Sequence, residues 1–240
     1  MFSVIFPGQG SQIVGMTSEF YSKHDLIKKL YKEADEILNF PLSKLILEGP
    51  KDQLDLTENT QPAIFLVGYS IFRLITEHHK IDIKKSKFFA GHSLGEYTAL
   101  ACAGALSFSD TLKILKIRGK AMQEAVPRGE GGMLAILGSD IESIDKILKE
   151  NEKNFECFIA NDNSDHQLVV SGSSENVQKF SDYLNVKKIK NIKLPVSAPF
   201  HCSLMSSATE IMKNQITNTD FKKPNNEIVS NVTAEHVNDP

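Results

Sequence analysis

The chain has 240 residues, a net charge of −3 and a hydrophobic fraction of 41%. This length is sufficient to bury a sizeable core, in one large domain or two smaller ones. The charge gives no reason to expect nucleic acid or an anionic membrane as a partner, and no apolar run is long enough to cross a bilayer. The three cysteines form no CxxC pair, which argues against a zinc site and fits a cytoplasmic protein.

Strands and helices alternate along the first half of the chain. Residues 2–6, FSVIF, form a short apolar run closed by Pro-Gly, which predicts a buried strand. The 25–38 segment places its apolar residues on one helical face. The apolar 62–79 segment starts with a proline suited to the first helical position. Residues 87–90, KFFA, predict a strand that runs directly into Gly91.

Two later helices carry recognisable N-terminal caps. The sequence SFSD at 107–110 precedes a helix predicted over about 110–125. Ser139 and Glu142 have the spacing of a capping box for a helix over 139–150. These patterns place one helix before and one helix after the glycine-rich segment 126–132.

The glycine-rich segment 126–132 marks a change in pattern. Beyond it we expect a strand, a helix, two strands, a helix and a final strand. These elements are predicted at 133–137, 139–150, 155–160, 167–172, 173–186 and 188–196. Their βαββαβ order is that of the ferredoxin-like split unit. We therefore expect a small domain at 128–196, inserted into a larger domain made of 1–127 and 197–240, with a strand at 227–232.

The sequence GHSLGEY, residues 91–97, lies between a predicted strand and a predicted helix. Gly-x-Ser-x-Gly in this position is the pattern of a nucleophile elbow, whose sharp turn exposes the serine hydroxyl at a helix N-terminus. Glycine at 91 and 95 fits this interpretation, because a side chain at either position would collide with neighbouring backbone. The alternative is a Ser/Gly turn without chemistry. Ser93 is the candidate nucleophile.

The loop FPGQGSQ, residues 6–12, is a second glycine-rich turn after a strand. It matches neither phosphate-binding pattern. The dinucleotide fingerprint requires glycine where Ile13 stands, and the P-loop requires Gly-Lys-Ser/Thr where Gly15 is followed by Met16. The loop could instead bring a backbone N–H to the carbonyl oxygen of an acyl group, with the N–H of Leu94 as a second donor. A plain structural turn is the alternative.

A serine nucleophile at neutral pH needs a base. Among the seven histidines, His92 adjoins Ser93 and points its side chain away from the hydroxyl. His201 follows Ala-Pro-Phe in a loop and begins a predicted helix, so it is the candidate base of a Ser–His dyad. A loop histidine with a purely structural role is the alternative. Arg118 lies on a largely apolar helix, where it either holds a carboxylate or phosphate or reaches solvent along its methylenes.

Seven segments together resemble one family, the malonyl-CoA:acyl-carrier-protein transacylases of fatty acid synthesis. They occur in the family's order and span the chain, and the set is far more specific than Gly-x-Ser-x-Gly alone. The resemblance implies an α/β fold, with an α/β-hydrolase-like large domain and an inserted ferredoxin-like small domain. The segments are FPGQGSQ (6–12), TQPAIF (60–65), GHSLGEY (91–97), RGKAMQEAVP (118–127), NDNSDHQLVVSG (161–172), PVSAPFHCSLM (195–205) and VSNVTA (229–234).

The resemblance assigns roles to individual residues. It makes Ser93 the acylated nucleophile and His201 its base. It implies that the backbone amides of Gln9 and Leu94 form the oxyanion hole, and that Arg118 holds the malonyl carboxylate.

Further implications concern the substrate and the partners. Phe200, in the sequence Pro-Phe-His, is expected to restrict branched extender units, and Gln61 and Asn161 are expected near the pocket. The substrates implied are malonyl-CoA and the phosphopantetheinyl acyl carrier protein. The resemblance implies no metal and no other cofactor, and we expect a monomer.

The family pattern continues beyond the position that corresponds to Pro240. The resemblance implies a further strand, a GPG-type turn and closing helices, and this segment supplies the carbonyl that orients the catalytic histidine. This segment is absent after HVNDP, so the sequence is either a fragment or a shortened protein. A binding protein without activity is therefore one alternative function. A serine hydrolase is another alternative, because it shares the elbow, the dyad and the oxyanion hole.

Overall fold

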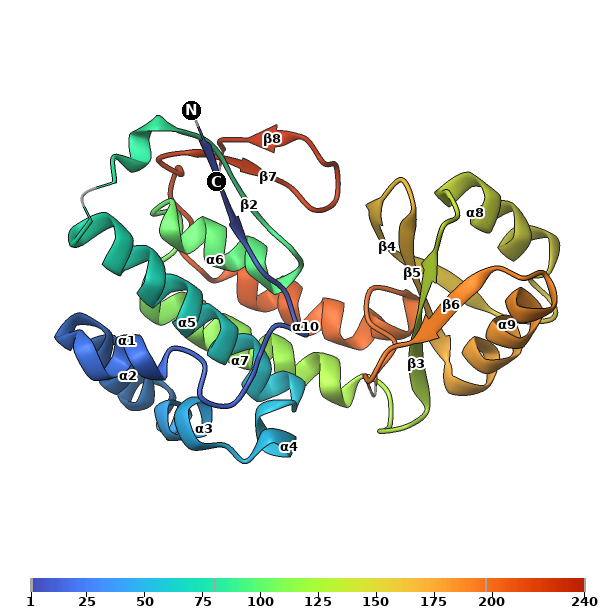
Figure 1. Cartoon of the computed structure of the whole chain (residues 1–240), viewed down its shortest axis with the longest axis horizontal. Helices are drawn as coiled ribbons and strands as arrows, with labels where there is room; N and C mark the ends of the chain where they lie inside the picture. The colour runs from blue at the N-terminus through green and yellow to red at the C-terminus, as the bar shows by residue number, and fades with distance from the viewer. Residues whose placement is uncertain (1, 80, 197, 240) are drawn as a thin grey trace. The chain divides into compact units, whose positions relative to one another are not determined.

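The computed structural model describes residues 2–79, 81–196 and 198–239 (Figure 1). The chain forms two compact units, which are described separately below. One consists of Met1–Lys120 and Asn214–Pro240, and the other of Ala121–Lys213. Ser197, the first residue expected of the returning large domain, lies outside the described residues.

The two units divide within helices rather than at the glycine-rich segment. The sequence placed the boundaries at 127/128 and 196/197. The last turn of α7 (Phe108–Glu124) and most of α10 (Ser206–Thr217) group with the second unit. The physical reason is burial, because Met122 of α7 and Ala208 of α10 pack into the core of that unit.

The first unit is built on a sheet whose strands come from distant parts of the sequence. Its order is β1 (Phe2–Phe6), β2 (Ser86–Gly91), β7 (Glu227–Val229) and β8 (His236–Val237). The first three strands are parallel, and β8 pairs antiparallel with β7. The segments that follow β1, β2 and β7 therefore leave the sheet at one edge, which is where open α/β sheets bind ligands.

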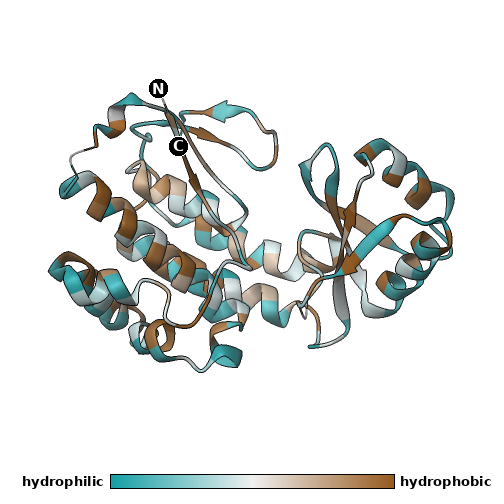
Figure 2. Ribbon diagram, in the orientation of Figure 1, coloured by the Kyte–Doolittle hydropathy of each residue, from teal (hydrophilic) through white to brown (hydrophobic). Residues whose placement is uncertain are grey.

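Helix α6 packs against this sheet, and α5 packs against α6. Phe6, Phe89 and Ile228, from three neighbouring strands, are buried together with Ala99 and Ala103 at α6. Hydrophobic residues run along most of α5 (Figure 2), as expected for a buried helix. The helical elements, apart from α7 and α10, are α1 (Ser18–Lys23), α2 (Asp25–Leu38), α3 (Leu42–Glu48), α4 (Lys51–Leu54), α5 (Thr57–Glu77), the 3₁₀ turn η1 (Ile83–Lys85) and α6 (Leu94–Cys102).

Helix α5 begins earlier than the sequence predicted. Pro62 was expected at the first helical position, but the helix starts at Thr57 and Pro62 lies inside it. Buried polar contacts hold the additional turn, since the Thr60 hydroxyl donates to the Leu54 carbonyl oxygen at 2.6 Å. Such tertiary contacts override the local preference of proline for a helix start.

The second unit contains an antiparallel sheet in the order β4-β5-β3-β6. In the chain its elements follow one another as β3, α8, β4, β5, α9 and β6. Their bounds are β3 (Gly131–Leu137), α8 (Ile141–Glu150), β4 (Cys157–Ser164), β5 (Gln167–Ser173), α9 (Ser174–Val186) and β6 (Lys190–Lys193), with a 3₁₀ turn η2 (Ser203–Met205) before α10.

The central strand β3 is buried on both faces. Leu134 and Ile136 pack with residues of α8 and α9. Met133 and Ala135 point the other way and pack with a second cluster that contains Phe200. This alternation follows from the two-residue period of a strand, and it explains why the 133–137 run is apolar at every position.

The N-terminal cap of α8 differs from the prediction by one residue. The sequence pointed to Ser139 and Glu142, but Asp140 is the cap, and its carboxylate accepts from the backbone N–H of Ser143 at 2.7 Å. A carboxylate also interacts favourably with the positive end of the helix dipole. At α7 the prediction is confirmed, because the Ser107 hydroxyl accepts from the N–H of Asp110 at 3.0 Å.

Candidate active site

The turn between β2 and α6 holds Ser93 in an unusual backbone conformation. Its φ and ψ are 53° and −108°, a region that residues with a side chain rarely occupy. A Cβ atom at Gly91 would lie 1.9 Å from the carbonyl carbon of Gly95, and one at Gly95 would lie 2.6 Å from the Phe6 carbonyl oxygen. Glycine is thus required on both sides of the serine, as the sequence predicted.

Arg118, on α7, lies against Ser93. Its Nη2 donates to Ser93 Oγ at 3.1 Å, and its Nη1 donates to Gln61 Oε1 at 2.7 Å. Gln61 is a buried residue of α5, and the Arg118 guanidinium also lies over the Tyr97 ring, 5.6 Å from its centroid. Helices α5, α6 and α7 therefore fix the guanidinium beside the serine hydroxyl.

The Arg118 guanidinium is largely shielded from water. Burial lowers the pKa of Arg118 from its ordinary value, and nearby Tyr97 and Glu96 oppose this shift. Burial also raises the pKa of Glu96, against the opposing effects of the Asn231 backbone N–H and of Arg118. An arginine stays charged under these conditions, because its ordinary pKa is far above neutrality. The site therefore presents a partly buried cation to any group that approaches Ser93.

The loop after β1 packs against the Ser93 turn. The backbone N–H of His92 donates to the Phe6 carbonyl oxygen at 3.1 Å, and a Cβ atom at Gly8 would lie 2.6 Å from His92 Nδ1. The Gln9 side chain donates to the Thr57 hydroxyl at 3.2 Å, which anchors the loop to the start of α5. The loop is thus fixed at the edge of the sheet where the serine turn lies.

Leu94 is the first residue of α6. Backbone N–H groups in the first turn of a helix have no partner within the helix, and the dipole favours negative charge there. Its N–H directly follows the candidate nucleophile in the chain. The position suits a group that stabilises an oxyanion.

Three predicted site residues belong to the second unit. His201 is exposed and has a φ of 59°, in a turn where Cys202 Sγ donates to the Pro199 carbonyl oxygen at 3.1 Å. Phe200 is buried in the hydrophobic cluster that contains Met133 and Ala135 of β3. Asn161, on β4, is half-buried next to an irregularity in the pairing with β5. The dyad of Ser93 and His201 stays a prediction.

Sequence reasoning missed three residues that surround the Ser93–Arg118 pair. Glu96 and Tyr97 follow Ser93 at three and four positions along the chain, so the helical period gave a usable signal for them. Asn231 lies in a segment beyond β7 and contacts both Ser93 and Gly91. Its closeness depends on the pairing of β2 with β7, which no local pattern reveals.

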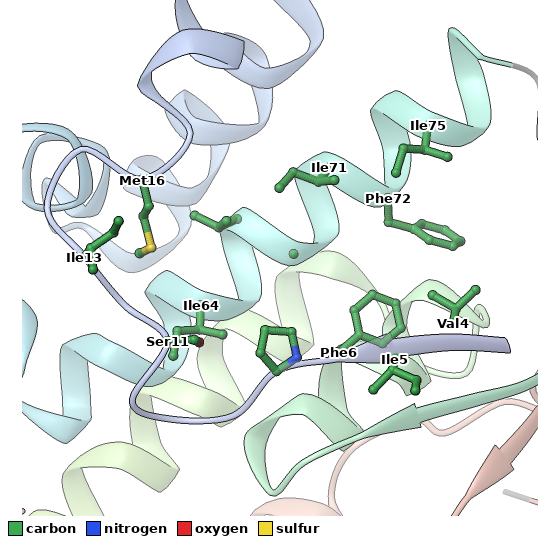
Figure 3. A pocket seen from close by; sticks show the side chains of 13 residues that line it. Val4, Ile5, Phe6, Ser11, Ile13, Met16, Ile64, Ile71, Phe72 and Ile75 are labelled. Carbon is green, nitrogen blue, oxygen red and sulfur yellow. The ribbon is translucent and has the colours of Figure 1, made fainter.

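An apolar cavity of about 370 Å³ lies elsewhere in the first unit, between β1 and α5 (Figure 3). Val4 and Phe6 of β1 and Ile71 and Phe72 of α5 line it. Ser93 does not line this cavity, whereas Pro7 and Ser11 of the loop after β1 do.

Two features of the described residues concern metal and membrane binding. No group of three or more His, Cys, Asp or Glu side chains among them is arranged to hold a metal ion. Across 2–79, 81–196 and 198–239, no helix has the length and apolar character that a membrane span requires.

Comparison with known proteins identifies the family. The model of the acyl transferase domain family matches residues 3–240. The malonyl CoA-acyl carrier protein transacylase of Bacillus subtilis strain 168 is 42% identical over 96% of this chain and 72% of its own length. The protein of that name from Haemophilus influenzae is 38% identical over 96% of this chain and 74% of its own.

Solved structures agree with this assignment. An acyl-carrier-protein S-malonyltransferase from Bartonella henselae superposes with a TM-score of 0.94 at 40% identity, covering 100% of this chain and 77% of that one. A malonyl-transacylase in complex with its type II PKS acyl-carrier protein gives a TM-score of 0.93 at 36% identity, covering 99% and 76%. The chain has an α/β fold and belongs to the malonyl CoA-acyl carrier protein transacylase family.

Proposed function

We propose that the chain transfers a malonyl group from malonyl-CoA to the phosphopantetheine thiol of acyl carrier protein, through a malonyl ester on Ser93. The reaction serves fatty acid biosynthesis. The observation that carries the proposal is the contact between the Arg118 guanidinium and Ser93 Oγ at 3.1 Å. A cation beside the nucleophile binds an acyl group that ends in a carboxylate, and malonyl is such a group.

In the first half-reaction, Ser93 Oγ attacks the thioester carbonyl of malonyl-CoA while His201 accepts the hydroxyl proton. The carbonyl oxygen becomes an oxyanion, which the backbone N–H groups of Gln9 and Leu94 stabilise. The loss of one such donor typically costs about 10²–10³ in rate. The C–S bond then breaks, and His201 returns its proton to the CoA thiolate, which leaves a malonyl ester on Ser93.

In the second half-reaction, the phosphopantetheine thiol of the carrier protein attacks the ester. His201 takes the thiol proton and passes it to Ser93 Oγ as the C–O bond breaks. The malonyl group leaves as a thioester of the carrier protein, and the enzyme returns to its starting state. The cycle consumes no redox equivalent and uses no cofactor besides the thioester donor and the thiol acceptor.

Arg118 and its surroundings select the acyl group. The guanidinium has a fork of donors that matches a carboxylate in two parallel hydrogen bonds. Gln61, which accepts from Nη1 at 2.7 Å, orients that fork. Phe200 restricts branched extender units, and Asn161 lies near the substrate.

The finer description of the fold is part of the same proposal. The order β3-α8-β4-β5-α9-β6 supports a ferredoxin-like domain at 128–196. The parallel strands and the serine turn of the first unit support an α/β-hydrolase-like domain made of 1–127 and 197–240. We place the protein in the cytoplasm, as a monomer.

The test is consumption of malonyl-CoA with and without phosphopantetheinyl carrier protein. The proposal predicts rapid formation of malonyl-carrier protein and slow release of free malonate. If malonate accumulates at the same rate whether or not the carrier protein is present, the chain is a hydrolase and the transfer function is wrong.

A further inference from the structure

We propose that Asn231 is a positioning residue that fixes the Ser93 turn for acyl transfer; this rests on the proposed function, which makes Ser93 the nucleophile. The Asn231 side chain bridges the turn. Its Oδ1 accepts from the backbone N–H of Ser93 at 2.7 Å, and its Nδ2 donates to the carbonyl oxygen of Gly91 at 2.6 Å. One amide thus contacts the residue before the turn and the nucleophile itself.

The pairing of two parallel strands delivers Asn231 to this position. Strand β7 pairs with β2 up to Val229, which lies opposite Ala90. Asn231 follows two residues later, alongside the turn that ends β2. A tight turn then holds it, because the Ser230 N–H donates to the Glu235 carbonyl oxygen at 2.9 Å.

The conformation of Ser93 gives this bridge its importance. With φ at 53° and ψ at −108°, the serine occupies a region that is costly for a residue with a side chain, and such strain persists only where the surroundings impose it. A primary amide supplies one acceptor and two donors, so Asn231 satisfies the Ser93 N–H and the Gly91 carbonyl together. Asn231 is exposed, but its amide still matches the Ser93 N–H with an acceptor and the Gly91 carbonyl oxygen with a donor.

The bridge also decides which amides face the oxyanion. The Ser93 N–H is engaged by Asn231 and is directed toward the 231 segment. The next N–H in the chain, that of Leu94, follows the nucleophile at the start of α6 and takes the oxyanion role. Asn231 therefore acts on the reaction through Ser93, without touching the substrate.

The first experiment compares Asn231→Ala with Asn226→Ala. Asn226 is a matched control, since its Nδ2 also donates to a backbone carbonyl, that of Ile83 at 3.2 Å, at the opposite end of β7. Single-turnover formation of the malonyl ester, KM for malonyl-CoA and thermal stability are measured for each. Displacing a reacting group by about 1 Å can cost roughly 10²-fold, so Asn231→Ala is expected to lose about ten- to a hundredfold in acylation rate with KM little changed.

Asn226→Ala is expected to keep the native acylation rate. If Asn231→Ala acylates at the native rate, or if both variants lose rate equally, Asn231 does not position the nucleophile. If the native chain forms no malonyl ester, the proposed function itself fails, and the bridge has no nucleophile to position.

Asn231→Asp tests the same bridge with a side chain of the same shape, and it serves if Asn231→Ala does not fold. When ionised, the new carboxylate still accepts from the Ser93 N–H. Its second oxygen faces the Gly91 carbonyl oxygen, and because both are acceptors no hydrogen bond forms there. When protonated, it donates there as the amide did. Because an aspartate ordinarily titrates at about pH 3.9, the ratio of variant to native acylation rate is expected to rise as pH falls from about 6 to about 4. A ratio that stays at one throughout would overturn the proposal.

Discussion

Arg118 and Ser93 are linked by a hydrogen bond from Nη2 to Oγ of 3.1 Å. Because the guanidinium donates, the serine oxygen accepts. The same guanidinium has a second donor, Nη1, on Gln61. A carboxylate that replaces the serine contact would place its acyl carbon close to Oγ, which couples substrate recognition to the attack.

Arg118→Ala is predicted to change kcat/KM for malonyl-CoA and for acetyl-CoA in different ways. Truncating one member of a buried charge pair typically costs about 2–5 kcal/mol, or roughly 30- to several-thousand-fold in kcat/KM for malonyl-CoA. Acetyl-CoA has no carboxylate, so its kcat/KM is expected to stay the same or to rise. Transfer assays with both thioesters measure the effect, and an equal loss for the two would assign Arg118 a structural role.

Gln61→Glu is predicted to weaken malonyl-CoA binding. The new carboxylate would pair with Arg118 and compete with the substrate for the guanidinium, which raises KM for malonyl-CoA. Hydrogen bonds to charged groups are worth about 1.5–3 kcal/mol, so the rise is expected to be roughly tenfold or more.

A matched control exists on the same two helices. Asn59 Oδ1 accepts from Lys116 Nζ at 2.8 Å, and this pair has the same sequence separation as Gln61 and Arg118. Asn59→Asp is expected to leave KM unchanged. If the two variants change KM alike, the Gln61–Arg118 contact has no special part in binding.

Gly91→Ala is predicted to prevent the serine turn from forming. The added Cβ would lie 1.9 Å from backbone atoms of Gly95, and backbone cannot move aside as a side chain can. We expect a loss of about 3 kcal/mol or more in the free energy of unfolding. Gly132→Ala is the control, because its Cβ would lie 3.6 Å from the Val177 side chain. Denaturant unfolding would contradict the account if both variants were equally stable.

Glu96→Gln is predicted to change the pH dependence of stability. Burial raises the pKa of Glu96 above its ordinary value of 4.5, so the folded protein binds a proton there more readily than the unfolded chain. The contribution of the protonated group is fully present below about pH 4.5 and is lost as pH rises through the folded-state pKa. At neutral pH the variant is therefore expected to be more stable than the native protein, and this advantage should disappear in acid.

Glu175 offers a control of opposite sign. Its pKa is lowered by the hydrogen bond from Lys179, so any contribution is present above about pH 4.5 and is lost as pH falls. Glu175→Gln is expected to have a small effect in the opposite direction, since the pair is exposed. Thermal unfolding from pH 4 to pH 8 compares the two variants, and parallel curves for native protein and Glu96→Gln would contradict the predicted shift.

The parts of the fold and site that follow local rules could be predicted from the sequence. The helix over 25–38 has the bounds expected from its apolar face. The Ser93 turn lies between a strand and a helix as predicted, and its two glycines permit the close backbone contacts that the turn requires. The cap of α8 was misplaced by one residue, since Ser139 and Asp140 are both good caps and only packing chooses between them.

The parts that depend on long-range packing could not be predicted in this way. From the sequence, the Arg118 side chain could either hold a buried anion or reach solvent. The packing of α5 against α7 decides between these alternatives, because it places Gln61 within hydrogen-bond distance of Arg118. Asn231 gave no local signal, because its position depends on the parallel pairing of β2 with β7. A pattern along the chain does not specify which strands become neighbours.

The most direct test of the account is the mass of the intact protein after incubation with malonyl-CoA, followed by peptide mapping. The account predicts one malonyl group on the native chain, located on the peptide that contains Ser93. It predicts no adduct on Ser93→Ala and almost none on His201→Ala, with both variants folded. A native chain that gains no malonyl group, or one that carries it on a residue other than Ser93, would contradict the account.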